Sequence, residues 1–455
     1  MVGAGRVVVG LLVLGLGAAV GTAGTVETAG AATPDAFAAS AASAPTASAP
    51  RAAAPQAAAL KADASGASVP GASASGVSAR KARARDPFGT WTGTWEAAPS
   101  GTVPAHPGAS FRNVVHVSVG GGAARVRLTN RLGTAPLRLD AVTVALRESG
   151  ADAVPGSMRA VTFAGVAAVT IPAGEDLVSD PVPLAVPDGA DLLVTVHTPG
   201  DSGPATYHRA AGQTNYRAPQ GNRTADEDGA AYTATTTSWY YVTGVDVLDA
   251  QAAGSVVALG DSLTDGNGST LDANHRWPDR LAERLATLPS YRRLGVLNAG
   301  ISGNRLLRDD VGPSGLSRLD ADALSRSGVR VLIVLEGIND IKGVPNATDP
   351  GAFEDAYRAL VARAHAHGIR VIGATLTPYG GAGAFTAARE AVRQKVNTFI
   401  RGGGPFDAIV DFDAAVRDPA QPQRILPGYD SGDHLHFNDA GMRALAEAVD
   451  LTALG

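Results

Sequence analysis

The sequence predicts an all-β domain, sandwich-like or jelly-roll-like, followed by an α/β domain built on a parallel sheet. Two observations predict this order. Apolar and polar residues alternate in the first half of the chain, whereas continuous apolar runs alternate with helical stretches after Gly254. The length of 455 residues favours two folded domains with extensions over one core. We place the all-β domain at residues 87–250 and the α/β domain at residues 251–455.

The first 86 residues are expected to lie outside both domains. A short positive start, Met1 to Arg6, precedes an apolar run from Val7 to Val20, and Ala29-Gly30-Ala31 fits a cleavage site. This pattern predicts a signal peptide at residues 1–31 and a secreted protein with no stable membrane span after its removal. A membrane anchor is the alternative, but a spanning helix needs ~20 apolar residues. Residues 32–86 are rich in Ala, Ser and Pro, which predicts a disordered linker.

The all-β prediction depends on period-two segments separated by Gly and Pro turns. Such alternation is typical of half-buried antiparallel strands, and several short strands at this spacing indicate a sandwich or jelly roll. The alternating apolar positions are Val115, Val117 and Val119; Val126 and Leu128; Val142, Val144 and Leu146; and Leu192, Val194 and Val196. A group of aromatic residues has two interpretations, core packing, which we favour, or a sugar-stacking platform: Trp239, Tyr240, Tyr241, Tyr207 and His208.

The α/β prediction depends on apolar strands that alternate with helices. The expected strands are Ser255–Leu259, Arg293–Leu297, Val329–Leu335, Ile369–Thr375 and Ala408–Val410. The expected helices are Trp277–Leu288, Leu316–Ser327, Phe353–His367, Thr386–Ile400 and Asn438–Val449. Fully apolar strands indicate a sheet covered on both faces, and ligands of such sheets bind at the carboxyl ends of the strands.

Polar residues gather at those strand ends, in a pattern that suits acyl transfer. Ser262 follows the first strand on a tight turn, and a serine nucleophile requires an imidazole base. His436 can supply that base, and Asp433, three residues earlier, can hold the other ring nitrogen. The oxyanion then needs donors, for which we select the backbone N–H groups of Ser262 and Gly303 and the side-chain amide of Asn339.

These blocks resemble the SGNH hydrolase family, also called GDSL esterases and lipases. The resemblance covers about residues 254–455, and four blocks appear in family order: Gly260-Asp261-Ser262-Leu263, Ile301-Ser302-Gly303-Asn304, Gly337-Ile338-Asn339-Asp340 and Asp433-His434-Leu435-His436. Ile338 replaces the Gly more often seen in the third block. The resemblance implies a flavodoxin-like, three-layer α/β/α domain, ester hydrolysis without a metal or cofactor, and the residue roles given above. Thr264 stands where the α/β-hydrolase elbow Gly-x-Ser-x-Gly would have its last Gly.

Several residues remain as rivals or neighbours of the predicted site. His434 is the alternative base, and Asp430 is the alternative to Asp433. Asp261 and Asp340 are expected to bond loop backbone, and Asn298 and Asn304 to shape the second loop. His275, Arg276 and Trp277 have two interpretations: they line the substrate pocket, or they start a helix and pack in the core.

Composition and missing motifs exclude other classes of function. The chain has no Cys, which excludes disulfides and thiol catalysis, and its formal net charge of -5 argues against a nucleic-acid partner. No phosphate-binding glycine motif occurs, so no nucleotide partner is expected. His365 and His367 are two apart on a helix and face different directions, and residues 226–228 lack the spacing of a Ca²⁺ loop. We therefore expect neither a metal nor a cofactor.

The sequence thus predicts a secreted serine ester hydrolase. The expected substrate is a short-acyl ester, with an O-acetylated polysaccharide favoured because the whole arrangement also resembles exported actinobacterial hydrolases and carbohydrate-esterase-like branches. The alternatives are an arylesterase or lipase that acts on longer acyl chains, and a non-catalytic protein that binds glycan or cell wall.

Overall fold

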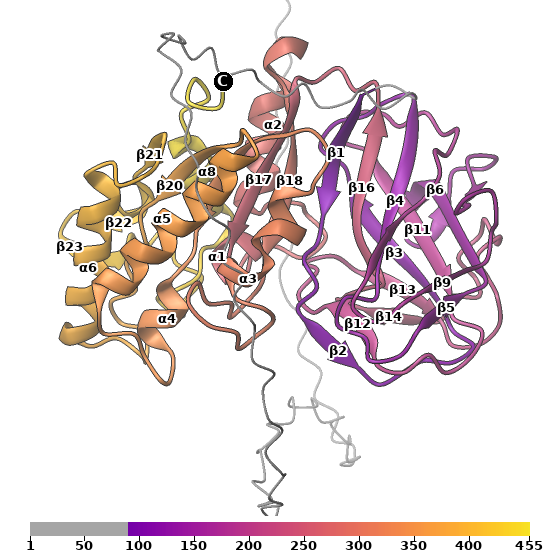
Figure 1. Cartoon of the computed structure of the whole chain (residues 1–455), viewed down its shortest axis with the longest axis horizontal. Helices are drawn as coiled ribbons and strands as arrows, with labels where there is room; N and C mark the ends of the chain where they lie inside the picture. The colour runs from indigo at the N-terminus through magenta and orange to yellow at the C-terminus, as the bar shows by residue number, and fades with distance from the viewer. Residues whose placement is uncertain (1–89) are drawn as a thin grey trace, which may run out of the picture. The chain divides into compact units, whose positions relative to one another are not determined.

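The computed structural model describes residues 90–455 (Figure 1). The predicted signal peptide at residues 1–31 and linker at residues 32–86 lie outside the described residues. The remaining chain contains an all-β part up to Leu248 and an α/β part from Gly254 onward.

Two antiparallel sheets form the all-β part. The smaller has the order β1 (Trp91–Glu96), β16 (Val242–Leu248), β4 (Ala123–Thr129) and β10 (Asp176–Val178). The larger has the order β14 (Ala234–Thr236), β13 (Asn215–Ala218), β3 (Ser110–His116), β11 (Asp191–His197), β6 (Ala141–Ser149) and β7 (Asp152–Ala153), and β8 (Arg159–Ala160) also pairs with β6. Shorter pairings join β15 (Trp239–Tyr240), β12 (Ala205–His208) and β2 (Gly101–Val103), and β5 (Leu137–Leu139) with β9 (Val169–Ile171).

The inner faces of the two sheets share one hydrophobic core, which confirms the predicted sandwich. Val126 and Val245 of the smaller sheet pack in the same cluster as Val144 and Val194 of the larger. The expectation of half-buried strands is wrong for the centre of the larger sheet. There Leu193, on the opposite face of β11, is also buried, because it packs in a second cluster with Val114 and Ala145.

Four members of the aromatic group are buried in the sandwich, and Tyr207 is partly buried against the same core. Trp239 is 2% exposed, packs edge-on to Trp95 at 5.0 Å between ring centroids, and donates Nε1–H to the Val114 carbonyl. Tyr240 and Tyr241 are also buried. Their faces are occupied by protein, so the sugar-stacking interpretation fails and core packing is the correct one.

The α/β part contains a five-stranded parallel sheet. Its order is β18 (Leu294–Gly300), β17 (Gly254–Gly260), β19 (Val329–Leu335), β20 (Arg370–Ala374) and β21 (Ala408–Val410). In chain order this is 2-1-3-4-5, the flavodoxin-like arrangement, so the predicted topology is confirmed. A separate hairpin pairs β22 (Arg417–Asp418) with β23 (Gln421–Ile425).

Helices cover both faces of this sheet (Figure 1). Val256 of β17 packs on the face covered by α2 (Trp277–Ala286), α7 (Phe412–Val416) and α8 (Asp439–Ala448). Val257, the next residue, packs on the opposite face, covered by α3 (Gly315–Leu319), α5 (Pro350–Ala366) and α6 (Ala387–Arg401). Alternate strand residues therefore enter two cores, which explains why the strands read as continuous apolar runs.

Short elements at the strand ends escaped the sequence analysis. These are α1 (Ser262–Asp265), α4 (Ile338–Lys342), α7 and the 3₁₀ turn Ser290–Arg292. The helix expected at 316–327 also differs: α3 is followed by a π-helical turn at Asp320–Leu324. Four or five residues are too few to show a helical period, so only the tertiary structure reveals these turns.

The sandwich and the sheet contact one another through backbone. β1 packs against β18, Gly93 donates its N–H to the Ser327 carbonyl, and the Ser255 hydroxyl donates to the Gly93 carbonyl. A Cβ on Gly295 would lie 2.1 Å from the Gly93 oxygen, so this approach requires glycine in β18. The two parts therefore share a tightly packed, partly hydrogen-bonded boundary.

Candidate active site

Ser262 lies at the carboxyl end of β17, on the first residue of the single-turn helix α1. The Asp261 side chain caps this turn by accepting the Leu263 N–H, and Gly266 ends it with a left-handed φ of 105°. The Ser262 side chain is nearly buried, with the residue 5% exposed. The local sequence thus fixes the hydroxyl on a tight turn at the edge of the sheet, as predicted.

His436 reaches Ser262 from the loop that precedes α8. Its Nε2 lies 2.8 Å from Ser262 Oγ, and its Nδ1 lies 2.5 Å from Asp433 Oδ2. The structure therefore joins the hydroxyl, the imidazole and the carboxylate in one hydrogen-bonded chain, although Ser262 and His436 are 174 residues apart. In this geometry the imidazole can take the serine proton, and the carboxylate can hold the ring in the tautomer that does so.

Asp433 is held in its charged form. Partial burial favours the neutral acid, but the backbone N–H groups of His436 and Leu435 and the His436 ring outweigh it and lower the pKa of Asp433 to about 2. Both N–H groups donate to Asp433 Oδ1, at 2.8 and 3.0 Å. The spacing of three residues allows the carboxylate to cap its own loop with one oxygen and bind the imidazole with the other.

The rival residues form a separate pair. His434 Nδ1 lies 2.6 Å from Asp430 Oδ2, and its backbone N–H also donates to Asp430. His434 therefore has an acidic partner four residues earlier, a spacing that the sequence analysis did not consider. Asp430 binds His434 and not His436, so the alternative in which Asp430 replaces Asp433 does not agree with the structure.

The three predicted oxyanion donors lie at neighbouring strand ends, but they differ in their hydrogen bonds. Within residues 90–455, no acceptor binds the backbone N–H of Ser262 or Gly303. Asn339 Nδ2, in contrast, donates to the Asn304 carbonyl at 2.8 Å and to Asp261 Oδ2 at 3.2 Å. The bond to Asp261 is the longer of the two. A substrate oxyanion would therefore compete with the Asp261 carboxyl group for the Asn339 amide.

Residues 258–444 match the model of the GDSL-like lipase/acylhydrolase family. These residues belong to that family. The resemblance found in the sequence is confirmed, and this part of the chain is a carboxylic ester hydrolase domain.

Solved structures similar to this GDSL-like domain include three hydrolases. An aryl esterase of M. smegmatis is 19% identical, with 42% of this chain and 94% of that chain covered and a TM-score of 0.35. A carbohydrate acetylesterase of Sinorhizobium meliloti is 19% identical, with coverage of 43% and 95% and a TM-score of 0.34. A GDSL-like lipase of Bacteroides thetaiotaomicron is 18% identical, with coverage of 44% and 88% and a TM-score of 0.34. A search of curated proteins finds no match.

Three buried carboxyl groups, those of Asp261, Glu336 and Asp340, interact with one another at the strand ends of the GDSL-like domain. Burial raises the pKa of Asp261 to about 7, with Asp340 adding to the effect and Lys342 and Arg318 opposing it. Burial and the neighbouring Asp261 raise the pKa of Glu336 well above its usual range. Asp340, whose pKa is also raised by burial, accepts the N–H groups of two loop residues, Leu306 and Leu307. As expected, Asp261 and Asp340 bond loop backbone.

The two asparagines of the second loop also bond backbone, as expected. Asn298 Oδ1 accepts the Gly300 N–H and its amide donates to the Thr264 carbonyl, while Asn304 Nδ2 donates to the carbonyls of Val311 and Pro313. These bonds fix the loop that holds Gly303.

His275, Arg276 and Trp277 lie at or directly before the start of α2. The Arg276 side chain pairs with Asp279 at 2.8 Å, and Trp277 is fully buried with its Nε1–H directed at Thr264 Oγ1. His275 Nδ1 lies 2.6 Å from Asp439 at the start of α8. Helix initiation accounts for Arg276 and core packing for Trp277, while His275 connects the loop before α2 to the start of α8.

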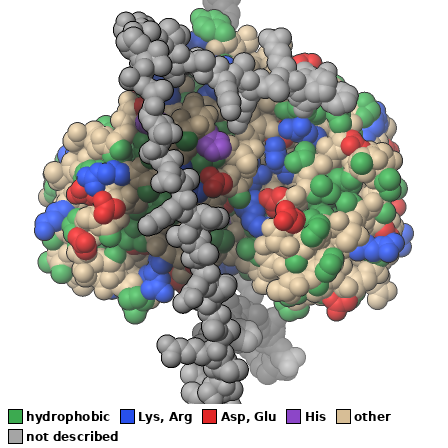
Figure 2. Space-filling view, viewed as in Figure 1, with side chains coloured by type: hydrophobic (Ala, Val, Ile, Leu, Met, Phe, Trp, Pro, Cys, Tyr) green, Lys and Arg blue, Asp and Glu red, His purple; other side chains and the backbone are tan. Residues whose placement is uncertain are grey.

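The described part of the chain shows neither a metal-binding cluster nor a membrane-spanning helix. Within residues 90–455, no group of three or more His, Asp and Glu side chains is placed to hold a metal ion. None of the helices in that range has the length and apolarity needed to cross a bilayer. On the face in Figure 2, basic and acidic side chains are interspersed.

Asp265 was not among the predicted site residues, and the ion pair of its partner His208 was not expected. Asp265 closes the α1 turn three residues after Ser262, and its carboxylate meets His208 of the sandwich, which sequence analysis grouped with the aromatic residues. Asp265 is visible as the second acid of the nucleophile block. Nothing in the sequence connects it to a histidine 57 residues away in the other domain.

Proposed function

We propose that this protein is a secreted serine esterase that hydrolyses short-acyl esters, with O-acetylated carbohydrate as the favoured substrate. The observation that carries the proposed mechanism is the hydrogen-bonded chain from Ser262 Oγ through His436 to Asp433, with distances of 2.8 and 2.5 Å. It lies in a domain whose family hydrolyses acyl esters.

The reaction follows from this chain of contacts. Ser262 Oγ attacks the ester carbonyl while His436 Nε2 takes its proton, and the negative oxygen that forms accepts hydrogen bonds from the N–H groups of Ser262 and Gly303. His436 then gives the proton to the departing alcohol, which leaves an acyl-enzyme. Water attacks this intermediate with His436 as base, the acid is released, and Ser262 regains its proton.

The proposed substrate class and location rest on other observations. The signal pattern at residues 1–31 supports export. The loose resemblance of the arrangement to carbohydrate-esterase-like branches supports acetylated polysaccharide. Longer acyl chains remain the alternative for the same mechanism, because one methylene changes binding in an apolar pocket by only ~1–3 kcal/mol. The non-catalytic alternative loses support, since Trp239, Tyr240 and Tyr241, which were offered as a sugar platform, are buried in the sandwich.

The first experiment measures hydrolysis of p-nitrophenyl esters from acetyl to palmitoyl by the full chain and by Ser262→Ala. We expect the highest kcat/KM with acetyl and a loss of ~10³-fold or more in Ser262→Ala. An optimum at long chains would keep the mechanism and replace the substrate class with lipids. Equal rates in both proteins would show that Ser262 is not the nucleophile.

A further inference from the structure

The sandwich domain contacts both catalytic loops through one short segment, residues 208–214. Arg209 Nη2 donates to the Ser302 carbonyl at 3.1 Å, directly before Gly303. Gln213 Nε2 and the Thr214 hydroxyl bind the two carboxylate oxygens of Asp272, at 2.7 and 2.6 Å. Asp272 lies in the loop that follows the nucleophile, and its N–H donates back to the Gly212 carbonyl. The segment thus holds the nucleophile loop and the glycine loop together.

His208, at the start of this segment, forms a buried ion pair with Asp265. Nε2 of His208 lies 3.0 Å from Asp265 Oδ1, and the two side chains are 2% and 3% exposed. Nδ1 of the same ring lies 2.7 Å from the Ala98 carbonyl. A carbonyl and a carboxylate only accept hydrogen bonds, so both ring nitrogens must carry a proton and the ring is a cation.

The charge on His208 agrees with its surroundings. Burial disfavours the cation, but Asp265 and the carbonyls of Ala98 and Ala210 outweigh it and raise the pKa of His208 above its usual value. A buried pair of this kind loses stability when one partner is removed, because the other charge is left without compensation.

The second oxygen of Asp265 reaches the loop that holds Gly303. Asp265 Oδ2 accepts the Ser302 backbone N–H at 2.8 Å and the Ser302 hydroxyl at 2.5 Å. Asp265 and Ser262 are the last and first residues of α1. One carboxylate therefore connects the turn that bears the nucleophile to the residue before a predicted oxyanion donor.

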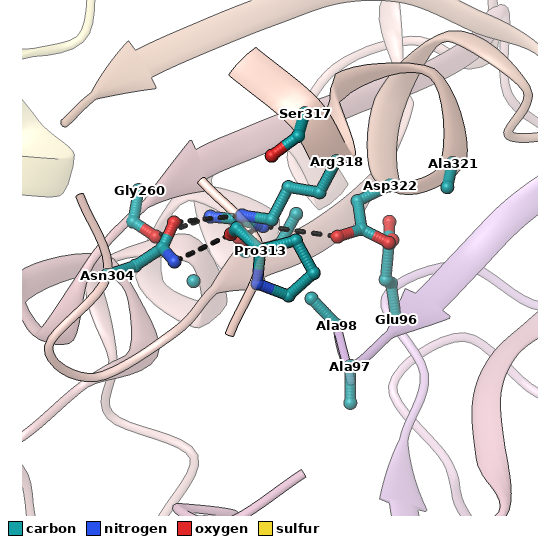
Figure 3. A network of polar contacts seen from close by, with 12 residues as sticks. Glu96, Ala97, Ala98, Gly260, Asn304, Pro313, Ser317, Arg318, Ala321 and Asp322 are labelled. Carbon is teal, nitrogen blue, oxygen red and sulfur yellow. Dashed lines mark hydrogen bonds and ion pairs between the residues drawn. The ribbon is translucent and has the colours of Figure 1, made fainter. Parts of the chain in front are cut away.

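The turn needs such support from outside. A helix of four residues does not hold its own shape, because nucleation of an isolated turn is unfavourable. Arg318 supplies one support from within the GDSL-like domain, where it donates to the Gly260 and Ala299 carbonyls and to Asn304 Oδ1 (Figure 3). These bonds hold the strand ends and the glycine loop, and His208 is the group that holds Asp265 of α1 from the sandwich.

We propose that His208 of the sandwich is a positioning residue of the esterase, which acts through Asp265 to hold α1 and the Ser302–Gly303 loop in register. This inference rests on the proposed roles of Ser262 and Gly303. It makes the sandwich part of the catalytic unit, in place of a role as an appended binding module. His208 does not touch the reacting atoms. It acts through Asp265, which in turn binds Ser302.

The test compares two substitutions of His208, each of which keeps one of the two hydrogen bonds made by the ring nitrogens. An Asn side chain places its amide near the position of Nδ1 and keeps the bond to Ala98, whereas a Gln side chain extends to the position of Nε2 and keeps a donor for Asp265. We expect His208→Asn to lower kcat for p-nitrophenyl acetate by about tenfold or more with KM within about threefold, since ~1 Å of misplacement costs ~10²-fold. His208→Gln should recover most of kcat.

The control removes a different contact between the same two domains. The Ser327 hydroxyl binds Arg127 and Asp246 of the sandwich and lies just before the amino end of β19. Ser327→Ala should lower Tm and leave kcat at the wild-type value. A role for His208 in stability alone would make His208→Asn behave like this control, with reduced Tm and unchanged kcat, and would overturn the proposal.

Hydrogen exchange gives a readout that does not depend on ester hydrolysis. We expect faster exchange at residues 262–266 and 300–304 in folded His208→Asn than in wild type or His208→Gln. Wild-type exchange at these residues in His208→Asn would overturn the inference even if the proposed activity is absent. Equal hydrolysis by wild type and Ser262→Ala would instead contradict the proposed function. If His208→Asn does not fold, Asp265→Asn is measured in its place.

Discussion

Two histidines of one loop, His434 and His436, have similar local partners and different long-range ones. Each ring binds an aspartate of the same loop, Asp430 for His434 and Asp433 for His436. His436 alone of the two has its second nitrogen on Ser262 Oγ, at 2.8 Å. The contact with Ser262 therefore distinguishes His436, the predicted base, from His434, the less favoured alternative in the sequence analysis.

This difference gives a matched pair of substitutions. His436→Ala should lower kcat for p-nitrophenyl acetate by ~10³-fold or more, because the serine then has no base. His434→Ala removes a similar ring from the same loop and should keep kcat within about tenfold. Steady-state kinetics of the two variants, with circular dichroism to confirm folding, decide the matter. A larger loss in His434→Ala than in His436→Ala would reverse the assignment.

At the scale of elements, the site depends on how strand ends are held together. Arg318 of α3 is buried and donates to the Gly260 carbonyl of β17, the Ala299 carbonyl of β18 and the Asn304 side chain (Figure 3). It also lies 3.3 Å from Asp322 and 3.5 Å from Glu336. A planar guanidinium can serve several acceptors at once, which a shorter or uncharged side chain cannot do.

Arg318→Gln should therefore cost more than an ordinary substitution. We expect a loss of about 3–5 kcal/mol in the free energy of unfolding, since three buried acceptors, the Gly260 and Ala299 carbonyls and Asn304 Oδ1, lose a charged donor. The control is Arg363→Gln on α5, which removes a half-exposed pair with Asp320 and should change stability by less than ~1 kcal/mol. Urea unfolding of both variants measures the difference. Similar losses in the two variants would show that the buried contacts of Arg318 contribute no more to the free energy of unfolding than a surface ion pair does.

Helices and strands of this domain were largely predictable, whereas the turns that carry the site were not. The expected strand Val329–Leu335 is observed with the same bounds, and α5 extends the expected Phe353–His367 helix by three residues at its start. These segments are long enough to show their period. The shorter α1 and α4 hold Ser262 and Asn339, and there the close approach of neighbouring strands sets the backbone.

At the scale of the whole molecule, the boundary between sandwich and hydrolase buries ionisable side chains as well as backbone contacts. Arg326 of the GDSL-like domain lies 2.8 Å from Glu96 of β1, and Asp322 pairs with Arg131 of the sandwich. Burial raises the pKa of Glu96 to about 8, although Arg326 lowers it and Asp322 adds to the rise. These contacts explain why the sandwich and the GDSL-like domain form one compact unit.

The raised pKa of Glu96 gives a stability prediction with a defined sign. The carboxyl of the unfolded chain ionises near its ordinary pKa of 4.5, while the folded one keeps its proton to about pH 8. This group therefore destabilises the fold progressively from pH 4.5 to 8. Glu96→Gln removes the effect. We expect the Tm of Glu96→Gln relative to wild type to rise between pH 5 and pH 8, measured by calorimetry.

An exposed acid provides the comparison for that measurement. Glu354 of α5 pairs with Arg358 at the surface, and Glu354→Gln should show a difference from wild type that does not rise over this range. If Glu96→Gln instead loses Tm relative to wild type as the pH rises, then Glu96 is charged in the folded protein and its ion pair with Arg326 dominates.

The sequence by itself determined the order of an all-β part and an α/β part and the parallel sheet, and it predicted Ser262, Asp433 and His436 as the catalytic residues. These follow from local information: the period of apolar residues, a serine directly after a buried strand, and an acid three residues before an imidazole. Only the tertiary structure decided that Asp430 belongs to His434, that the sandwich aromatics are core, and that His208 holds Asp265 across the domain boundary. Each of these depends on contacts between side chains whose partners are set by packing, because spacing along the chain does not encode which distant surfaces meet.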